Sequence, residues 1–271
     1  MDDSLTVTNS DTVLVERRGG VLLLTLNRPE RLNAWNDALE SRYFECLDVA
    51  DDDPSVKAIV VTGSGRGFCS GADLEDLASI GGTDVDAPLQ SGARPRSFPL
   101  SVRKPMIAAV NGAAAGLGLV EALYCDVRFA TPEAKFTTAF VRRGLIAEYG
   151  ISWLLARLIG QGAALDLLLS GRVVRGEEAQ RLGLVDRLSD GSSIVADAVA
   201  YAQELAEYCS PTSMAIIKAQ VRADMDRSFA DSVSAANDLM MESFRSPDVV
   251  EGVRSYMEQR PPLFPSLPPR G

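Results

Sequence analysis

The sequence predicts an α/β fold with a mixed first half and a mainly helical second half. Short apolar runs alternate with helical patterns through the first half, and helical spacing dominates from Ile151 onward. Two of the apolar runs, Val56–Thr62 and Met106–Val110, have the composition of buried strands, and each leads into a glycine-rich turn. The 271 residues suffice for one large domain, or for one domain with an appendage.

The first half begins with a predicted hairpin. Thr12–Glu16 and Val21–Leu26 are β-rich and flank a short polar turn that contains two glycines. Apolar residues then recur at helical spacing, which predicts a helix over Asn36–Ala50. Val127–Ala130 and Lys135–Thr138 are two further predicted strands.

The second half is predicted to be a series of helices. An apolar face that starts at Ile151 ends at Gly160, a residue typical of the position just after a helix. The later helices are predicted near Glu177–Leu182, Ile194–Tyr208, Thr212–Asp224, Phe229–Arg245 and Val249–Gln259. We therefore expect a core over residues 1–200, a C-terminal helical region for trimerisation or as a lid over 201–260, and an irregular proline-rich tail over 261–271.

Composition excludes several classes of function. A formal net charge of -10 without a long basic run argues against nucleic acid as a partner. No apolar run reaches the roughly 18–20 residues that cross a bilayer, so no membrane partner is expected. Met1–Ser10 does not resemble a signal peptide, and the four cysteines are scattered, which favours a reducing cytoplasm. Since the chain has no histidine, a Ser–His–Asp triad and a histidine-ligated metal are excluded.

The segment Ser79–Pro99 is rich in glycine and proline and has few apolar anchors. It is predicted to be a long loop. A lid over an active site and a disordered insertion both remain open for it.

Two turns share one design. Gly65–Leu74 follows the first buried strand and Asn111–Leu119 follows the second, and each passes through small residues toward a helical pattern. Small residues let a ligand approach the backbone closely, and a helix N-terminus presents unpaired N–H groups. Two such turns side by side could hold one developing oxyanion, although either turn alone would more often be structural.

In their order and spacing, these motifs resemble the crotonase (enoyl-CoA hydratase/isomerase) superfamily. The resemblance covers nearly the whole chain, through Leu26–Ala34, Gly67–Leu74, Lys104–Gly112, Gly116–Leu119, Cys125–Asp126, Gly144–Ile146, Gly171–Arg172 and Ala179–Val185. It implies a crotonase-like spiral of ββα units followed by helices, assembled as a trimer or a dimer of trimers. It also implies an acyl-CoA substrate, with no separate cofactor because coenzyme A is part of the thioester.

The resemblance also implies site residues. The N–H groups of Ala72 and Leu117 match the two donors that hold the thioester oxygen in the family. The adenine end of coenzyme A would lie near Arg28, Leu32, Gly71, Asp73 and Leu74. Arg28 could equally be a solvated charge at a strand end, and Asp73 fits a residue that organises backbone or caps a helix better than an acid catalyst.

The chain departs from the hydratase pattern at both catalytic glutamates. Alignment on the family motifs puts Val120 and Phe140 at these positions, and neither side chain can transfer a proton. Glu121 follows one place later, and a step of about 100° around a helix predicts that it points away from the site. Glu133 fits a surface turn.

Glu148 is the remaining candidate for an acid or base. It lies in Ile146–Trp153, the stretch where some isomerases of the superfamily carry their acidic base. The structural alternative is a glutamate favoured by the dipole at a helix start. Cys69 is expected to be a packed, unreactive thiol, because no histidine could activate it. Lys218 is expected either near the phosphates of coenzyme A or exposed on a helix.

Together these features predict an enzyme that stabilises a thioester enolate, and they favour an enoyl-CoA isomerase with Glu148 as proton shuttle. A hydratase and a non-catalytic acyl-CoA-binding protein are the alternatives. An apolar group in the predicted helix Phe229–Arg245 could pack on another subunit or on the chain's own core. Its members are Leu239, Met240, Met241 and Phe244.

Overall fold

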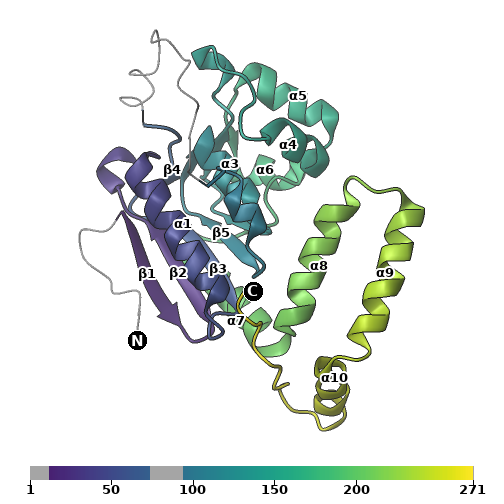
Figure 1. The fold of residues 1–271 in the computed structure, drawn as a ribbon. Helices are drawn as coiled ribbons and strands as arrows, with labels where there is room; N and C mark the ends of the chain where they lie inside the picture. Colours follow the sequence, from purple (N-terminus) through teal and green to yellow (C-terminus); the bar gives the residue numbers. More distant parts are fainter. Residues whose placement is uncertain (1–11, 74–93, 271) are drawn as a thin grey trace.

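A computed structural model describes residues 12–73 and 94–270 of the chain. Figure 1 shows a mixed body of strands and helices, from which the last helices project to one side. The predicted α/β class is confirmed.

The larger sheet has six strands in the order β1-β2-β3-β5-β7-β10. Strands β1 and β2 form the predicted antiparallel hairpin, and the other neighbours pair in parallel. The strands are β1 (Val13–Arg18), β2 (Val21–Leu26), β3 (Ala58–Gly63), β5 (Met106–Val110), β7 (Val127–Ala130) and β10 (Arg187–Leu188).

The smaller sheet has four short strands in the order β4-β6-β8-β9. They are β4 (Gly67–Cys69), β6 (Ala113–Ala115), β8 (Lys135–Thr137) and β9 (Val174–Arg175). The chain alternates between the two sheets, since β3, β5 and β7 of the large sheet are each followed by a strand of the small one. This alternation is the spiral that the sequence resemblance implies.

The bounds of the predicted helices agree with those of the described helices to within about two residues. Helix α5, which follows α4, is an additional helix that the sequence does not predict. The described helices are α1 (Asp37–Asp52), α3 (Leu117–Tyr124), α4 (Ile151–Ile159), α5 (Gln161–Ser170), α6 (Gly176–Leu182), α7 (Ile194–Tyr208), α8 (Pro211–Asp224), α9 (Phe229–Ser243) and α10 (Pro247–Met257). Three short 3-10 turns complete them: η1 (Pro29–Arg31), η2 (Phe98–Ser101) and η3 (Val141–Arg143). Helix α1 begins where the Asn36 side chain accepts a hydrogen bond from Leu39 N at 3.0 Å, which is an ordinary N-cap.

The core lies on both faces of the large sheet. Alternate residues of β2 point to opposite faces, so that Leu22 and Leu24 join one apolar cluster and Leu23 joins the other. The first cluster also includes residues of α1, α3 and the small sheet, and the second is covered by α7. Burial on both faces explains why these strands are continuous apolar runs. Helix α7 crosses residue 200 and packs on the sheet, while α8 follows it away from the sheet.

Helix α8 is tied to the body mainly by charge. Asp126 forms ion pairs with Lys218 at 2.6 Å and with Arg222 at 3.1 Å. Lys218 also donates to the carbonyl of Lys104 at 2.8 Å, and only 8% of its side chain is exposed. The prediction of an exposed lysine here is therefore wrong, because the acidic residue that follows α3 attracts this side chain to the body.

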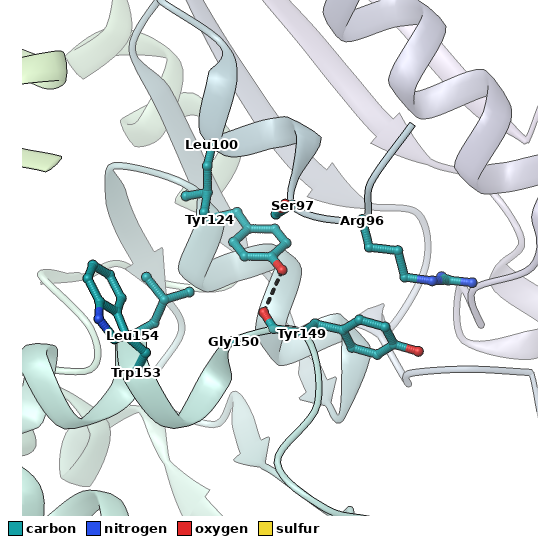
Figure 2. A pocket seen from close by; sticks show the side chains of 8 residues that line it. All are labelled: Arg96, Ser97, Leu100, Tyr124, Tyr149, Gly150, Trp153 and Leu154. Atoms are coloured by element: carbon teal, nitrogen blue, oxygen red, sulfur yellow. Dashed lines mark hydrogen bonds between the residues drawn. The ribbon is translucent and has the colours of Figure 1, made fainter. Parts of the chain in front are cut away.

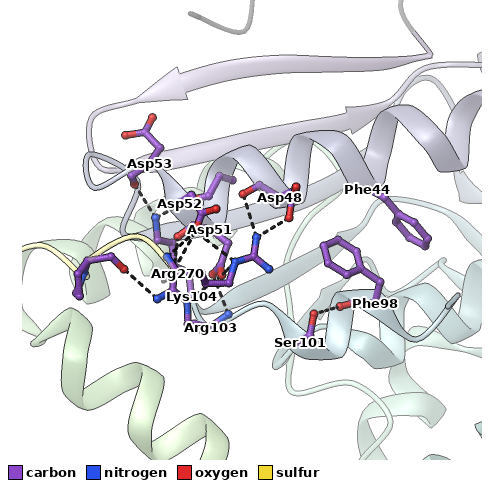
Figure 3. Close-up of polar contacts among 12 residues, drawn as sticks. Phe44, Asp48, Asp51, Asp52, Asp53, Phe98, Ser101, Arg103, Lys104 and Arg270 are labelled. Atoms are coloured by element: carbon purple, nitrogen blue, oxygen red, sulfur yellow. Dashed lines mark hydrogen bonds and ion pairs between the residues drawn. The ribbon is translucent and has the colours of Figure 1, made fainter. Parts of the chain in front are cut away.

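The tail after α10 has no regular structure and returns to the body. Figure 3 shows Arg270 beside the acidic end of α1, where it pairs with Asp48 at 2.5 Å and Asp52 at 3.2 Å. Arg103 donates to the carbonyl of Pro268 at 2.9 Å and pairs with the buried Asp51 at 2.9 Å. The end of the chain thus lies against the start of β5.

Within residues 12–73 and 94–270, no helix is both long and apolar enough to span a membrane, and no group of three metal-binding side chains occurs. Most of the predicted loop Ser79–Pro99 lies outside the described residues; its last part includes Arg94 and Arg96 and leads into η2.

Candidate active site

The first glycine-rich turn pairs with the segment before α1. Trp35 forms an isolated parallel bridge with Ala72. Its N–H donates to the Gly71 carbonyl at 2.8 Å, and its carbonyl accepts from Asp73 N at 2.9 Å. Gly71 has φ +96, a backbone conformation that favours glycine. These bonds fix the backbone of Ala72.

The second turn packs directly against the first. A Cβ added to Gly118 would lie 2.2 Å from the Cys69 carbonyl oxygen, so only glycine fits between α3 and β4. A Cβ added to Gly71 would lie 3.6 Å from Leu117 N. The two turns are therefore side by side in space, as the sequence predicts.

Both backbone donors of interest are available. Within the described parts of the chain, the N–H groups of Ala72 and Leu117 donate to no backbone or side-chain acceptor. Leu117 is the first residue of α3, whose positive dipole end lies at this point. Such a pair of free donors fits a developing negative charge on oxygen.

The residues expected near coenzyme A form a cluster of their own. Arg28 pairs with Asp73 at 3.1 Å and donates to the Ala34 carbonyl at 2.5 Å. Leu32 lies next to the end of β4, since its carbonyl accepts from Ser70 N at 3.0 Å. Leu74 lies outside the described residues. Arg28 is thus partly buried and paired within the chain, and is not a solvated charge.

Glu148 lies on a turn with unusual backbone geometry. The following residues, Tyr149 and Gly150, have φ +55 and φ +75, and α4 begins directly after them. A left-handed tyrosine is uncommon and is held only where its surroundings demand it. Glu148 itself is half-buried. Burial raises the pKa of its carboxyl above the ordinary value, and the positive charge of Arg96 opposes part of this rise.

The two hydratase positions are apolar and buried. Val120 is fully buried, and Phe140 is 6% exposed. Cys69 is also buried, so the expectation of a packed thiol is confirmed, and burial raises the pKa of this thiol to about 12. Glu133 is exposed, as predicted for a surface turn.

Glu121 does not point to solvent. It is 2% exposed, and neither of its carboxylate oxygens has a hydrogen-bond partner among the described residues. Burial raises the pKa of this carboxyl well above 4.5, with a further rise from Glu40 and an opposing effect of Arg96. The rotation of about 100° from Val120 turns the side chain toward α1 and the segment that carries Arg96.

An apolar cavity of about 370 Å³ opens next to the Glu148 turn. Figure 2 shows it between α3, α4 and the segment before η2. Its lining residues are Arg96, Ser97, Leu100, Tyr124, Tyr149, Gly150, Trp153 and Leu154. Ala72, Leu117 and Glu148 do not line it, whereas Tyr149, the residue after Glu148, does. A cavity of this size and polarity is suited to an apolar group of a small molecule.

Three residues of this region escaped the sequence reading. Arg96 belongs to a segment that was predicted only as a loop, Glu40 is an ordinary residue of a helix, and Tyr124 ends α3. Arg96 pairs with Glu40 at 2.5 Å, and Tyr124 OH donates to the Tyr149 carbonyl at 2.8 Å. No local pattern marks these contacts, because each joins distant parts of the chain.

The two adjacent turns, the spiral and the apolar cavity define a protein of the crotonase class. The chain belongs to the enoyl-CoA hydratase/isomerase family, whose model matches residues 16–266.

Named relatives within the family have different activities. The chain is 36% identical over 251 residues to 1,2-epoxyphenylacetyl-CoA isomerase of Escherichia coli. This match covers 90% of this chain and 95% of the relative. An enoyl-CoA hydratase structure from Polaromonas is similar with TM-score 0.87 and 28% identity, over 93% of this chain and 99% of that one. An enoyl-CoA hydratase structure from Mycobacterium marinum is 48% identical with TM-score 0.69, over 80% of this chain and all 100% of that one.

Proposed function

We propose that this protein is an enoyl-CoA isomerase in which Glu148 is the single proton shuttle. The observation that carries the proposal is the combination of a half-buried Glu148, whose next residue Tyr149 lines an apolar cavity, with apolar side chains at both hydratase positions, Val120 and Phe140. A hydratase needs a side chain to activate water, whereas an isomerase needs only one carboxylate.

In the proposed reaction, the carboxylate of Glu148 takes a proton from C2 of a 3-enoyl-CoA. The electron pair of the C2–H bond forms a C1=C2 double bond and the carbonyl π pair moves to the thioester oxygen, which gives a dienolate. When the carbonyl re-forms, the C1=C2 pair becomes the new C2=C3 double bond, and the C3=C4 pair takes the same proton back from Glu148 at C4. The N–H groups of Ala72 and Leu117 hold the negative charge that develops on the thioester oxygen. The apolar Val120 and Phe140 keep water from the intermediate.

The environment of Glu148 supports a role as a base. Burial raises the pKa of Glu148, so this pKa lies closer to neutral pH than that of an exposed glutamate. A base whose pKa lies nearer to the working pH transfers protons more effectively in both directions. Shuttling needs both directions, since the same proton returns to the substrate.

Glu148→Gln is the direct test of this function. The change keeps the shape of the side chain and removes the base, so isomerisation should fall by roughly 10²–10⁴-fold. Affinity for a saturated acyl-CoA should change little, and calorimetry can measure it. Glu133→Gln is the matched control, because Glu133 is exposed. Full activity in Glu148→Gln would rule out this mechanism.

The substrate panel should follow the named relatives and the cavity. Three aromatic side chains line the cavity, Tyr124, Tyr149 and Trp153, and they suit a flat or bulky acyl group. The panel therefore includes a 3-enoyl-CoA, crotonyl-CoA and 1,2-epoxyphenylacetyl-CoA. Hydration of crotonyl-CoA should be weak. Binding of saturated acyl-CoA without turnover of any of the three would favour a non-catalytic binding protein.

The expected location in the cytoplasm and assembly as a trimer or a dimer of trimers remain parts of this proposal. Apolar side chains on α9 and α10 support the assembly, because they are exposed to solvent in the described part of the chain.

A further inference from the structure

A chain of polar contacts runs from the Ala72 backbone to the Glu148 turn. Trp35, whose backbone pairs with Ala72, donates from its indole Nε1 to Glu40 Oε2 at 2.8 Å. The same oxygen accepts from Arg96 at 2.5 Å. The side chains of Glu40 and Arg96 are 10% and 21% exposed, so this ion pair is largely screened from water.

Arg96 continues the chain of contacts to Tyr149. Its guanidinium lies over the tyrosine ring, 5.3 Å from the centroid. From the other side, Tyr124 OH donates to the Tyr149 carbonyl at 2.8 Å, as Figure 2 shows. Two independent contacts thus hold the left-handed residue that directly follows Glu148.

The charges around Arg96 come from three elements. Glu40 lies on α1, Glu121 and Tyr124 lie on α3, and Glu148 and Tyr149 lie on the turn before α4. Burial raises the pKa of Glu121 well above 4.5, which favours its neutral form. Arg96 pairs directly with Glu40, and its positive charge also opposes the rise that burial causes in the pKa of Glu148.

We propose that Arg96, held in place by Glu40, is a positioning residue that couples the Ala72 backbone to the turn that carries Glu148. This inference rests on the proposed role of Glu148. Through this contact, the Ala72 N–H and the Glu148 carboxylate keep a fixed position relative to each other, although they lie on segments far apart in the sequence. Reactions that depend on such alignment lose rate steeply when one partner moves.

The chain offers a matched control two residues away. Arg94 also pairs with α1, through Asp48 at 2.6 Å, and its guanidinium also lies over an aromatic ring, that of Phe98 at 4.7 Å. It differs from Arg96 in having no contact with the Glu148 turn among the described residues. Arg94→Met and Arg96→Met therefore remove the same kinds of contact from the same segment.

The experiment compares these two variants in steady-state kinetics. In Arg96→Met, kcat should fall by about 10–100-fold while KM changes less than about threefold. Glu40→Gln should show a smaller fall in kcat, and Arg96→Lys should recover part of the loss because it restores the charge. Arg94→Met should behave as the wild type. Equal effects of Arg94→Met and Arg96→Met would overturn the proposal.

A second readout does not depend on turnover. A water-soluble carbodiimide modifies protonated carboxyls, and peptide mass spectrometry can follow the modification of Glu148 against pH. In Arg96→Met the midpoint should move to higher pH, because the positive charge that favours the carboxylate is gone. An unchanged midpoint would also overturn the proposal. A shifted midpoint together with a fully active Glu148→Gln would instead support the contact and reject Glu148 as the base.

Discussion

At the scale of single residues, Glu121 has the least favourable environment in the described chain. A buried carboxyl without a hydrogen-bond partner is costly in its charged form, so the folded protein holds it protonated. Its pKa is raised in the folded state above 4.5, the ordinary value. Above pH 4.5 the folded state binds more protons than the unfolded state, and this contribution to stability is lost as pH rises toward the raised pKa.

Glu121→Gln should remove this pH dependence. The variant cannot ionise, so its free energy of unfolding relative to the wild type should rise with pH above 4.5, by at most about 1.4 kcal/mol per pH unit. Urea unfolding between pH 5 and 8 measures the difference. The buried amide can add a constant offset, which does not affect the slope. A difference that stays constant with pH, as expected for the control Glu133→Gln, would contradict the prediction.

At the scale of elements, the site depends on the close approach of α3 to β4. Gly118→Ala would put a Cβ 2.2 Å from the Cys69 carbonyl oxygen, and backbone cannot move aside cheaply. We expect a loss of roughly 1–3 kcal/mol in the free energy of unfolding, and weaker acyl-CoA binding because the two turns separate.

The control for this prediction is Gly162→Ala on α5. Nothing lies within 4 Å of its added Cβ, and alanine favours a helix by roughly 0.5–1 kcal/mol over glycine. This variant should therefore be at least as stable as the wild type and should bind acyl-CoA normally. If both variants unfold at the same urea concentration, the close approach of α3 to β4 is not the reason why position 118 holds a glycine.

At the scale of the whole molecule, the last two helices expose large apolar side chains to solvent. No residue of α9 is buried, and Met241 and Phe244 are 50% and 61% exposed, so packing of this group on the chain's own core is excluded. On α10 and just beyond, Tyr256 and Met257 are 86% and 78% exposed. Figure 1 shows α8, α9 and α10 projecting from the body, which leaves these faces open to another subunit.

We expect sedimentation at micromolar concentration to show a trimer or a hexamer, with Phe244→Glu shifting the distribution toward smaller species. Burying a charge in an apolar interface is costly unless it is paired, which is the reason for this direction. Val49→Glu is the control, since Val49 is 40% exposed on α1, in the body. A monomeric wild type would contradict the predicted assembly.

The sequence by itself determined most of the longer helices and strands and the two turns, but not α5 or the short strands β4, β6, β9 and β10. Strand composition, helical spacing and glycines at turn positions act over a few residues, so they could be read without the fold. The family resemblance, which rests on the same local patterns, implies the site residues Ala72, Leu117 and Glu148. It also places Val120 and Phe140 where hydratases have their two glutamates.

Only the tertiary structure decided where the charged side chains meet. Helical spacing predicts only that Glu121 points away from the site, and the structure adds that it is buried near charged groups from α1 and from the segment before η2. Arg96 and Glu40 are 56 positions apart, and no local pattern predicts their contact. Helical spacing gives the direction of a side chain relative to its own helix, but what lies in that direction depends on how the helix packs against the rest of the fold.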